Sequence, residues 1–245
     1  MANKIITMCH YARPEYSRRA LEALAKCDGI EEYRVLAHVD RCPDSDILTQ
    51  VGQVLASAAI PNLWITTYPS RVGVNVNTAW ALAHGFEDGG AEFVIHVEDD
   101  ILLAPDALRF FEHCAVAYRD DPAVFSVTAY NRLQVCPDPD RWHDLQRREW
   151  YHGWGWGIWR DRWAECDVAQ APGTWDVHIH RNVMHRPRRR VEIHPTLSRS
   201  QNIGARSSLH TFSEEWHAEN HHVKHWAGDR HVPVGAWNER RIASD

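Results

Sequence analysis

The sequence predicts an α/β protein with a mainly parallel sheet flanked by helices, and two observations support this fold class. Strand-like and helix-like segments alternate through residues 1–130, which is typical of a parallel sheet with helices on both faces. Carboxylates directly follow two of the strand-like segments, at the edge where such sheets bind ligands. With 245 residues, 44% of them hydrophobic, the chain is long enough for one domain with a substantial core.

The first four elements are identified by the spacing of their apolar residues. KIITMC (4–9) is a short apolar run and predicts a buried strand. In 14–27 the apolar residues recur at helical spacing and Pro14 lies near the start, which predicts a helix. YRVLAHVD (33–40) predicts a second strand that ends in an aspartate, and DILTQVGQVLASA (46–58) predicts a second helix.

The next five elements continue the alternation. NLWITTY (62–68) predicts a strand and NVNTAWALAHGFED (75–88) a helix. EFVIHVE (92–98) predicts the fourth strand, PDALRFFEHCAVAYRD (105–120) the helix after it, and VFSVTAY (124–130) the fifth strand. We therefore expect the carboxyl ends of these strands to share one edge of the sheet.

Beyond residue 130 the pattern changes. Residues 136–150 are loop-like and rich in proline and aspartate, and residues 151–166 mix glycine with tryptophan. Residues 189–216 predict one short strand followed by a polar loop. Because the sequence contains no internal repeat, we expect a single domain, 1–245, whose irregular C-terminal half (131–245) completes the site.

Composition narrows the classes of function. The net charge of −6 argues against general polyanion binding. No apolar run reaches 18 residues and the N-terminus lacks the layout of a signal peptide, so we expect no membrane span. The six cysteines are scattered without a CxxC pair, which favours reduced thiols in a cytoplasmic protein over a secreted form with three disulfides.

Three adjacent carboxylates are the main candidate site. Glu98, Asp99 and Asp100 directly follow the apolar run 93–97. Adjacent carboxylates repel one another and are costly to bury, and a divalent cation removes that cost. Mg²⁺ and Mn²⁺ favour oxygen ligands and often share them with substrate phosphates. The alternative is a solvated acidic turn that caps the next helix through Asp100 or Asp106.

The segment VIHVEDDILLAPDALRFF resembles the acidic metal motif of GT-A fold glycosyltransferases, and more narrowly that of the N-acetylglucosaminyltransferase I group. VFSVTAYN, GWGWGIWRDRWAE and TWDVHIHRNVMHRPRRRVEIHPTLSRSQNIG resemble later segments of the same group, in the same order, so the resemblance extends from residue 4 to about residue 225. It implies a GT-A (Rossmann-like) mixed, mainly parallel sheet. The nucleotide-sugar donor would then bind in residues 1–130 and the acceptor in residues 131–245.

The resemblance also implies an activity. Its members are metal-dependent inverting glycosyltransferases, so we expect a UDP-sugar donor, Mn²⁺ or Mg²⁺, and transfer of a hexosyl or N-acetylhexosaminyl group. The family enzymes normally carry a membrane anchor and stem, and neither is apparent here. We therefore expect a microbial or viral relative that acts in the cytoplasm, on a glycan, a protein or modified DNA.

The residues of the donor site follow from the same resemblance. Asp100 matches the position that binds the metal, and Glu98 and Asp99 match positions near the sugar and ribose. Asp40 matches the aspartate that reads uracil; the alternative is an aspartate that caps a turn before the following proline. Arg13 follows the first strand and is expected to stack on the base or bind phosphate. Its alternative is a solvated loop arginine.

The acceptor side has one candidate base. Asp176 matches the family's catalytic aspartate, which takes the proton of the acceptor hydroxyl, and Trp175 beside it matches an acceptor platform. Val177 stands where the family has a second acidic residue, and the alternative is that Asp176 caps a helix. Trp154 and Trp156 would line the acceptor pocket if they lie on a loop, although core packing is the alternative for this glycine-tryptophan run.

Three further segments carry charged or ligating side chains. The loop at 200–216 resembles the segment that orders over the donor, with Gly204 for flexibility and Arg206, Ser207, Ser208 and His210 as phosphate donors. The histidines of the C-terminal region lack zinc-site spacing, although His221 and His225 would share a helical face. The basic cluster 185–190 predicts a solvated turn, or contact with a phosphate-bearing acceptor.

Two other functions compete with sugar transfer. A nucleotidyltransferase also uses carboxylates and a metal at a sheet edge, but it normally has a glycine-rich loop after the first strand, and MCHYARPEY contains no glycine. A non-catalytic carbohydrate-binding protein would use the tryptophans and would need neither the acidic triplet nor a base.

Overall fold

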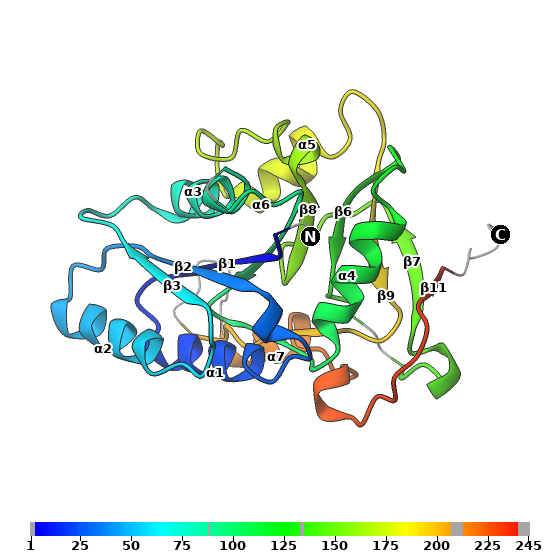
Figure 1. Ribbon diagram of the computed structural model, residues 1–245, viewed down its shortest axis with the longest axis horizontal. Coiled ribbons are helices and arrows are strands. Elements are labelled where there is room, and N and C mark those ends of the chain that lie inside the picture. Colours follow the sequence, from blue (N-terminus) through cyan, green and yellow to red (C-terminus); the bar gives the residue numbers. More distant parts are fainter. Residues whose placement is uncertain (1–2, 88, 133–134, 207–212, 240–245) are drawn as a thin grey trace.

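The computed structural model describes residues 3–87, 89–132, 135–206 and 213–239, and it places a central sheet between two layers of helices (Figure 1). The strands of the first half are β1 (Ile5–His10), β2 (Arg34–Val39), β3 (Leu63–Thr67), β4 (Phe93–Glu98), β5 (Ile101–Leu103) and β6 (Val124–Thr128). The helices between them are α1 (Pro14–Leu24), α2 (Ser45–Ala56), α3 (Val74–Phe86) and α4 (Ala107–Ala117). Each of the nine predicted elements is therefore confirmed, with small differences at its ends.

The second half adds strands β7 (Asp144–Arg148), β8 (Trp156–Trp159), β9 (Val191–Pro195), β10 (Ser200–Asn202) and β11 (Asn238–Glu239). It also adds helices α5 (Arg160–Trp163), α6 (Trp175–His178), which continues into a π-helical turn at Ile179–Val183, and α7 (Glu214–Asn220). The sheet order is β11-β7-β9-β6-β8-β4-β1-β2-β3, and β5 pairs with β10 separately. The strands β4, β1, β2 and β3 are mutually parallel, whereas β8 is antiparallel to both of its neighbours. The mixed, mainly parallel sheet is confirmed.

The second half contributes four strands to the central sheet, and of these only β9 was predicted from the sequence. Strand β8 is inserted between β4 and β6, and all four of its residues are buried. A strand buried on both faces shows no polar alternation, so the glycine-tryptophan run concealed it. Gly157 is required there, since a Cβ would lie 2.3 Å from the ring of Phe93.

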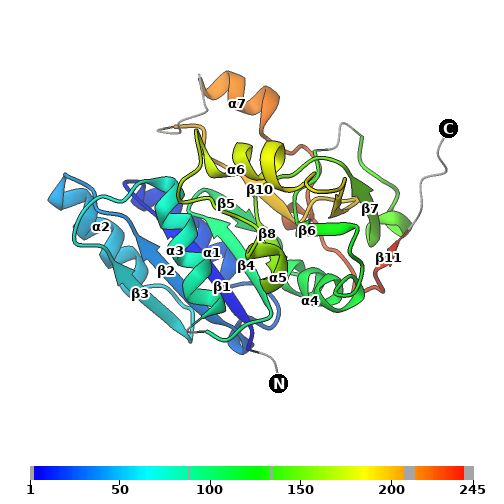
Figure 2. The same cartoon turned by 90° about the horizontal axis from the view of Figure 1, so that it is seen from above.

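Alternating side chains of each strand supply two cores. In β4, Ile95 and Val97 belong to the cluster packed by α1, α2 and α4, whereas Val94 belongs to the cluster packed by α3 and α6. Helix α2 begins where the carboxylate of Asp44 accepts hydrogen bonds from two amides of its first turn. Figure 2, the view from above, shows α7 on the opposite side of the molecule from the N-terminus.

The cysteines and the lengths of the helices also bear on the expectations from the sequence. The six cysteines are free thiols, and four of them are buried. Within the described ranges, no helix is both long enough and apolar enough to cross a bilayer.

Candidate active site

A cavity of about 470 Å³ opens beyond the carboxyl ends of β1, β2 and β4. Strand β1 lies between the other two in the sheet, so the segments that follow these three strands meet at one edge. The segments before β8 and at the start of α6 also line the cavity. The predicted site residues that line the cavity are Arg13, Asp40, Glu98, Asp99, Asp100, Trp154, Trp175 and Asp176.

Two of the three adjacent carboxylates, Asp99 and Asp100, are buried and paired with an arginine, whereas Glu98 is partly exposed. Asp99 and Asp100 form the turn between β4 and β5, and they are only 2% and 5% exposed. Arg13 forms an ion pair with Asp99, and its Nη1 donates to Oδ2 of Asp100 at 2.7 Å. The alternatives of a solvated acidic turn and of a solvated Arg13 are therefore wrong. Helix α4 begins at Ala107, and Asp106, which that alternative also named, is at its N-cap position without a capping hydrogen bond from its side chain. The carboxylate of Asp106 pairs with the buried Arg199.

The electrostatics of the triplet favour an additional positive charge. Burial raises the pKa of the Glu98, Asp99 and Asp100 carboxyl groups, and the charge of Arg13 only partly opposes this. Oδ1 of Asp100 is buried and has no hydrogen-bond partner within the described residues. Such an oxygen fits a hard cation, which commonly takes one or two protein carboxylates and completes its shell with phosphates and water.

No ready-made metal cage is present in the part of the chain that the structure describes. There, no group of three or more histidine, cysteine, aspartate or glutamate side chains is arranged to hold an ion. A cation at Asp100 would therefore need ligands from a bound substrate.

Asp40 makes three hydrogen bonds at the end of β2. Its Oδ1 accepts from the backbone N–H groups of Arg41 and Val72, both at 2.8 Å, and its Oδ2 accepts from that of Gly73 at 2.9 Å. Gly73 precedes the first residue of α3 and has a φ of 84°, in the range that favours glycine. Asp40 thus holds both the segment that leads into α3 and the start of the turn before Pro43, while it also lines the cavity.

Asp176 lies in the first turn of α6 and faces the cavity. Thr174 is the N-cap of that helix, so the expectation that Asp176 itself caps it is wrong. Oδ1 of Asp176 is buried and has no hydrogen-bond partner within the described ranges. The ring of Trp175 stacks on Trp156, with 5.6 Å between ring centroids, and Gly153 allows this packing because a Cβ there would lie 2.5 Å from Trp175.

The two tryptophans of the glycine-rich run have different environments. Trp154 lies in the bend before β8 and lines the cavity, with its ring 4.7 Å from that of His221. Trp156 belongs to β8 and is fully buried. The prediction that Trp156 binds the acceptor from a loop is therefore wrong, since its ring packs within the core and has no exposed face.

The predicted donor loop is only partly described. Ser207, Ser208 and His210 lie outside the described residues. The side chain of Arg206 is exposed and pairs with Glu214, and its backbone N–H donates to the hydroxyl of Tyr16 at 2.9 Å. Gly204 approaches the acidic turn so closely that a Cβ would lie 2.2 Å from Oδ2 of Asp100.

The histidine-rich region lies beside the cavity. Helix α7 ends at Asn220, so His221 and His225 do not share a helical face and that expectation is wrong. His221 lines the cavity, and Nε2 of His217 lies 2.9 Å from Oδ1 of Asn202, another cavity residue.

The basic cluster 185–190 is largely engaged within the protein. Arg190 is buried and donates to the carbonyl oxygens of Val183 and Met184. Arg189 pairs with Glu149, and Arg188 donates to a backbone carbonyl oxygen. The cluster does precede β9 as predicted, but the expectation that it is solvated is wrong for Arg190, whose guanidinium is buried against backbone carbonyls.

Several cavity residues were missed by the sequence analysis. Arg71 lies 5.2 Å over the ring of Tyr11, and both line the cavity. Asn77 also lines it, with a buried Oδ1 that has no hydrogen-bond partner among the described residues. Arg71 follows the third predicted strand at the same sheet edge as Asp40, and that position was a usable signal.

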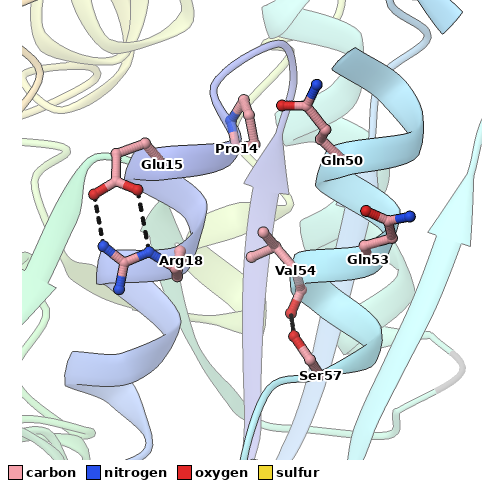
Figure 3. Close-up of a pocket in the computed structure, with 7 residues that line it drawn as sticks. All are labelled: Pro14, Glu15, Arg18, Gln50, Gln53, Val54 and Ser57. Carbon is pink, nitrogen blue, oxygen red and sulfur yellow. Dashed lines mark hydrogen bonds and ion pairs between the residues drawn. The ribbon is translucent and has the colours of Figure 1, made fainter. Parts of the chain in front are cut away.

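A second, shallower cavity of about 360 Å³ lies between α1 and α2 (Figure 3). None of the predicted site residues lines it. Glu15 and Arg18 on its α1 wall pair with each other, and Ser57 on the α2 side donates to the carbonyl oxygen of Val54. This groove lacks the converging carboxylates and aromatic rings of the larger cavity.

Comparisons with known proteins bear on the cavity and the fold. A sequence model described as the GNT-I family matches residues 67–224. The alpha-1,3-mannosyl-glycoprotein 2-beta-N-acetylglucosaminyltransferase of Arabidopsis thaliana is 29% identical over 141 residues, which cover 56% of this chain and 31% of that protein. The chain thus spans about a third of the length of this curated relative.

Solved structures share the fold at low sequence identity. The mannosyltransferase PcManGT from Pyrobaculum calidifontis, in complex with GDP-Man and Mn²⁺, superposes with a TM-score of 0.55 at 15% identity, over 80% of this chain and 58% of that one. Residues 1–349 of S. aureus TarS give a TM-score of 0.55 at 14% identity, over 79% and 60%. The fold is that of the GT-A glycosyltransferases.

Proposed function

Because this chain belongs to the GNT-I family, we propose that it is a glycosyltransferase that moves a sugar from a UDP-sugar to an acceptor hydroxyl. The observation that carries the proposal is the convergence of the acidic triplet, Arg13, Asp40 and Asp176 on one cavity at the carboxyl edge of the sheet. Both a donor site and a candidate base are required for sugar transfer, and this cavity contains candidates for each.

The donor would bind on the side of the cavity formed by β1, β2 and β4. The base of the nucleotide would bind at Asp40, and Asn77, whose buried amide oxygen has no hydrogen-bond partner among the described residues, lines the same cavity. Arg13 and Arg71 supply positive charge for the diphosphate, and an arginine can bind phosphate oxygens with two parallel hydrogen bonds. Glu98 and Asp99 would lie near the sugar and ribose.

A divalent cation, Mn²⁺ or Mg²⁺, fits this site. Asp100 would hold it through the buried oxygen that lacks a partner, and the diphosphate would complete its ligands. When bound, the cation stabilises the negative charge that develops on the diphosphate leaving group. PcManGT, which shares the fold, is described with GDP-Man and Mn²⁺.

Asp176 is the proposed general base of a single displacement. Its carboxylate takes the proton of the acceptor hydroxyl while the hydroxyl oxygen bonds to the anomeric carbon. The bond from that carbon to the diphosphate breaks at the same time, so the configuration of the sugar inverts. Trp175 holds Asp176 at the cavity wall through its packing on Trp156, and Trp154 offers an aromatic surface to the acceptor.

A release assay tests the proposal. UDP-sugars are supplied one at a time, with and without Mn²⁺, against glycan, protein and DNA acceptors, and liberated UDP is measured. We expect Mn²⁺-dependent release with at least one donor. Absence of release with every donor would reject sugar transfer.

The variant Asp176→Asn tests the base separately. It should lose transfer while it retains Mn²⁺-dependent binding of UDP, because the donor wall is unchanged. The exposed Asp120→Asn is the matched control and should keep both. Full turnover by Asp176→Asn would show that the base is another residue.

A further inference from the structure

The side chain of Asn75 joins the first turn of α3 to the segment that carries the proposed base. Its Nδ2 donates to the carbonyl oxygens of Gly173, at 2.7 Å, and Ala171, at 3.3 Å. Its Oδ1 accepts from the backbone N–H of Trp175 at 2.9 Å. One amide thus binds three backbone groups that are about a hundred residues away in the sequence.

Besides Asn75, the backbone of this segment contacts Val168 and His178: the N–H of Ala171 donates to the carbonyl oxygen of Val168 at 3.2 Å, and that of His178 donates to the carbonyl oxygen of Thr174 at 3.0 Å. Residues 171–174 contain Gly173, with a φ of 94°, and lead into α6, whose four α-helical residues continue into the π-helical turn. Thr174 is the N-cap of α6, but its side chain makes no capping hydrogen bond. The N–H groups at a helix start need partners, and Asn75 provides one for Trp175 from a different helix. The rings packed on Trp175 fix its side chain, whereas Asn75 fixes its backbone.

Asn75 also lies close to the donor wall. It is the second residue of α3, and the carboxylate of Asp40 holds the two backbone N–H groups directly before that helix, at Val72 and Gly73. A continuous series of hydrogen bonds therefore connects the end of β2, the start of α3 and the start of α6. The series begins at the carboxylate of Asp40 and ends at the N–H of Trp175, the residue directly before Asp176.

We propose that Asn75 is a positioning residue that sets the place of Asp176 relative to the donor. This inference rests on the proposed function, because it assigns Asp176 the role of base. Misplacement of a reacting group by about 1 Å can cost on the order of 100-fold in rate. Loss of the Asn75 contacts should therefore slow transfer and leave donor affinity almost unchanged.

Steady-state kinetics of Asn75→Ala test this, with the donor and acceptor that give release in the wild-type protein. We expect kcat to fall about 10- to 100-fold. Binding of UDP with Mn²⁺, measured by calorimetry, should stay within about threefold of the wild type, because Arg13, Asp40 and Asp100 are untouched. Asn62→Ala is the matched control: Asn62 also donates to a backbone carbonyl oxygen, that of Glu31, at the far end of β3, so its loss should leave kcat unchanged.

A double variant separates positioning from general stability. If Asn75 acts through Asp176, Asn75→Ala combined with Asp176→Asn should be no slower than Asp176→Asn alone. The inference would be overturned if the double variant transferred sugar more slowly than Asp176→Asn alone, by the factor that Asn75→Ala shows on its own. It would also be overturned if Asn75→Ala left kcat unchanged.

Hydrogen exchange distinguishes failure of this inference from failure of the proposed function. In Asn75→Ala, amides of residues 171–178 should exchange faster, while those of β4 should not change. If the wild type releases no UDP from any donor, the proposed function fails even where this exchange result is obtained. If the wild type is active and exchange at 171–178 is unchanged in the variant, the positioning role fails alone.

Discussion

Arg13 and Asp100 form an ion pair in which only one of the two carboxylate oxygens of Asp100 contacts the guanidinium. Nη1 of Arg13 lies 2.7 Å from Oδ2, whereas the buried Oδ1 has no hydrogen-bond partner within the described residues. Arg13 is shared with Asp99, so two buried carboxylates depend on one guanidinium. The unpaired oxygen is the reason that a cation is expected at this position.

The variant Asp100→Asn should lose the response to metal without losing the fold. UDP with Mn²⁺ should raise the melting temperature of the wild type and not that of the variant. Without ligands, the variant should melt within a few degrees of the wild type, because burial already raises the pKa of this carboxyl and an amide removes the buried charge. Thermal melting with and without UDP and Mn²⁺ measures both effects. If UDP with Mn²⁺ still raises the melting temperature of the variant, the cation does not bind at Asp100.

Gly204→Ala should weaken nucleotide binding. The added Cβ would lie 2.2 Å from Oδ2 of Asp100, so either the loop or the carboxylate must move. We expect at least a tenfold rise in the Kd of UDP with Mn²⁺, about 1.4 kcal/mol or more, measured by calorimetry. Gly52→Ala is the matched control, since a Cβ added there would have no atom within 4 Å and alanine favours the helix. If Gly204→Ala and Gly52→Ala bound UDP with the same Kd, the close approach of Gly204 to Asp100 would not matter for nucleotide binding.

The ion pair of Asp106 with Arg199 should contribute strongly to stability. Arg199 is fully buried, and its Nε donates to both oxygens of Asp106 at 3.0 and 3.1 Å. Asp106→Ala leaves that charge without its partner, so we expect a loss of about 3 kcal/mol or more in the free energy of unfolding in urea. Glu15→Ala breaks the exposed pair with Arg18 and should destabilise the protein much less, because water screens exposed ion pairs. Similar losses for the two variants would contradict this ranking.

Glu192 should make stability depend on pH. Burial raises its pKa from 4.5 to about 7, although Arg148, Ser126 and the N–H of His152 donate to its carboxylate. Between these two pH values the folded protein keeps a proton that the unfolded chain loses, so the stabilising contribution is complete below pH 4.5 and declines as the pH rises towards 7.

Glu192→Gln should remove that decline. Relative to the variant, the wild type should lose up to about 3 kcal/mol of unfolding free energy across this interval. Urea unfolding of both proteins at several pH values measures the difference. Parallel pH curves would show that Glu192 does not bind a proton on folding.

The first half of the fold could be predicted because its elements follow simple periodicities. The apolar runs that become β1, β2 and β4 are short and buried, and Pro14 marks the start of α1. The same reasoning located Asp40 and the acidic triplet, because residues after parallel strands share one sheet edge. Arg71 at the end of β3 fits that rule and was overlooked.

The second half could not be predicted in the same way. In β7, DLQRR is a charged segment that becomes a strand because Arg147 pairs with Asp121 and Glu239, and Arg148 pairs with Glu192. All of these partners except Asp121 come later in the sequence. The role of Asn75 was also not apparent, since its contacts depend on the packing of α3 beside α6.

The place of β8 has a consequence for any attempt to divide this protein. Residues Trp156–Trp159 fill the gap between β4 and β6, although both of those strands precede them by more than 25 residues. A fragment cut at residue 130 would leave two facing strand edges a full strand width apart, with their amides and carbonyls unsatisfied. The nucleotide-binding region therefore depends on chain that is synthesised later, and it should become protease-resistant only after β8 has been added.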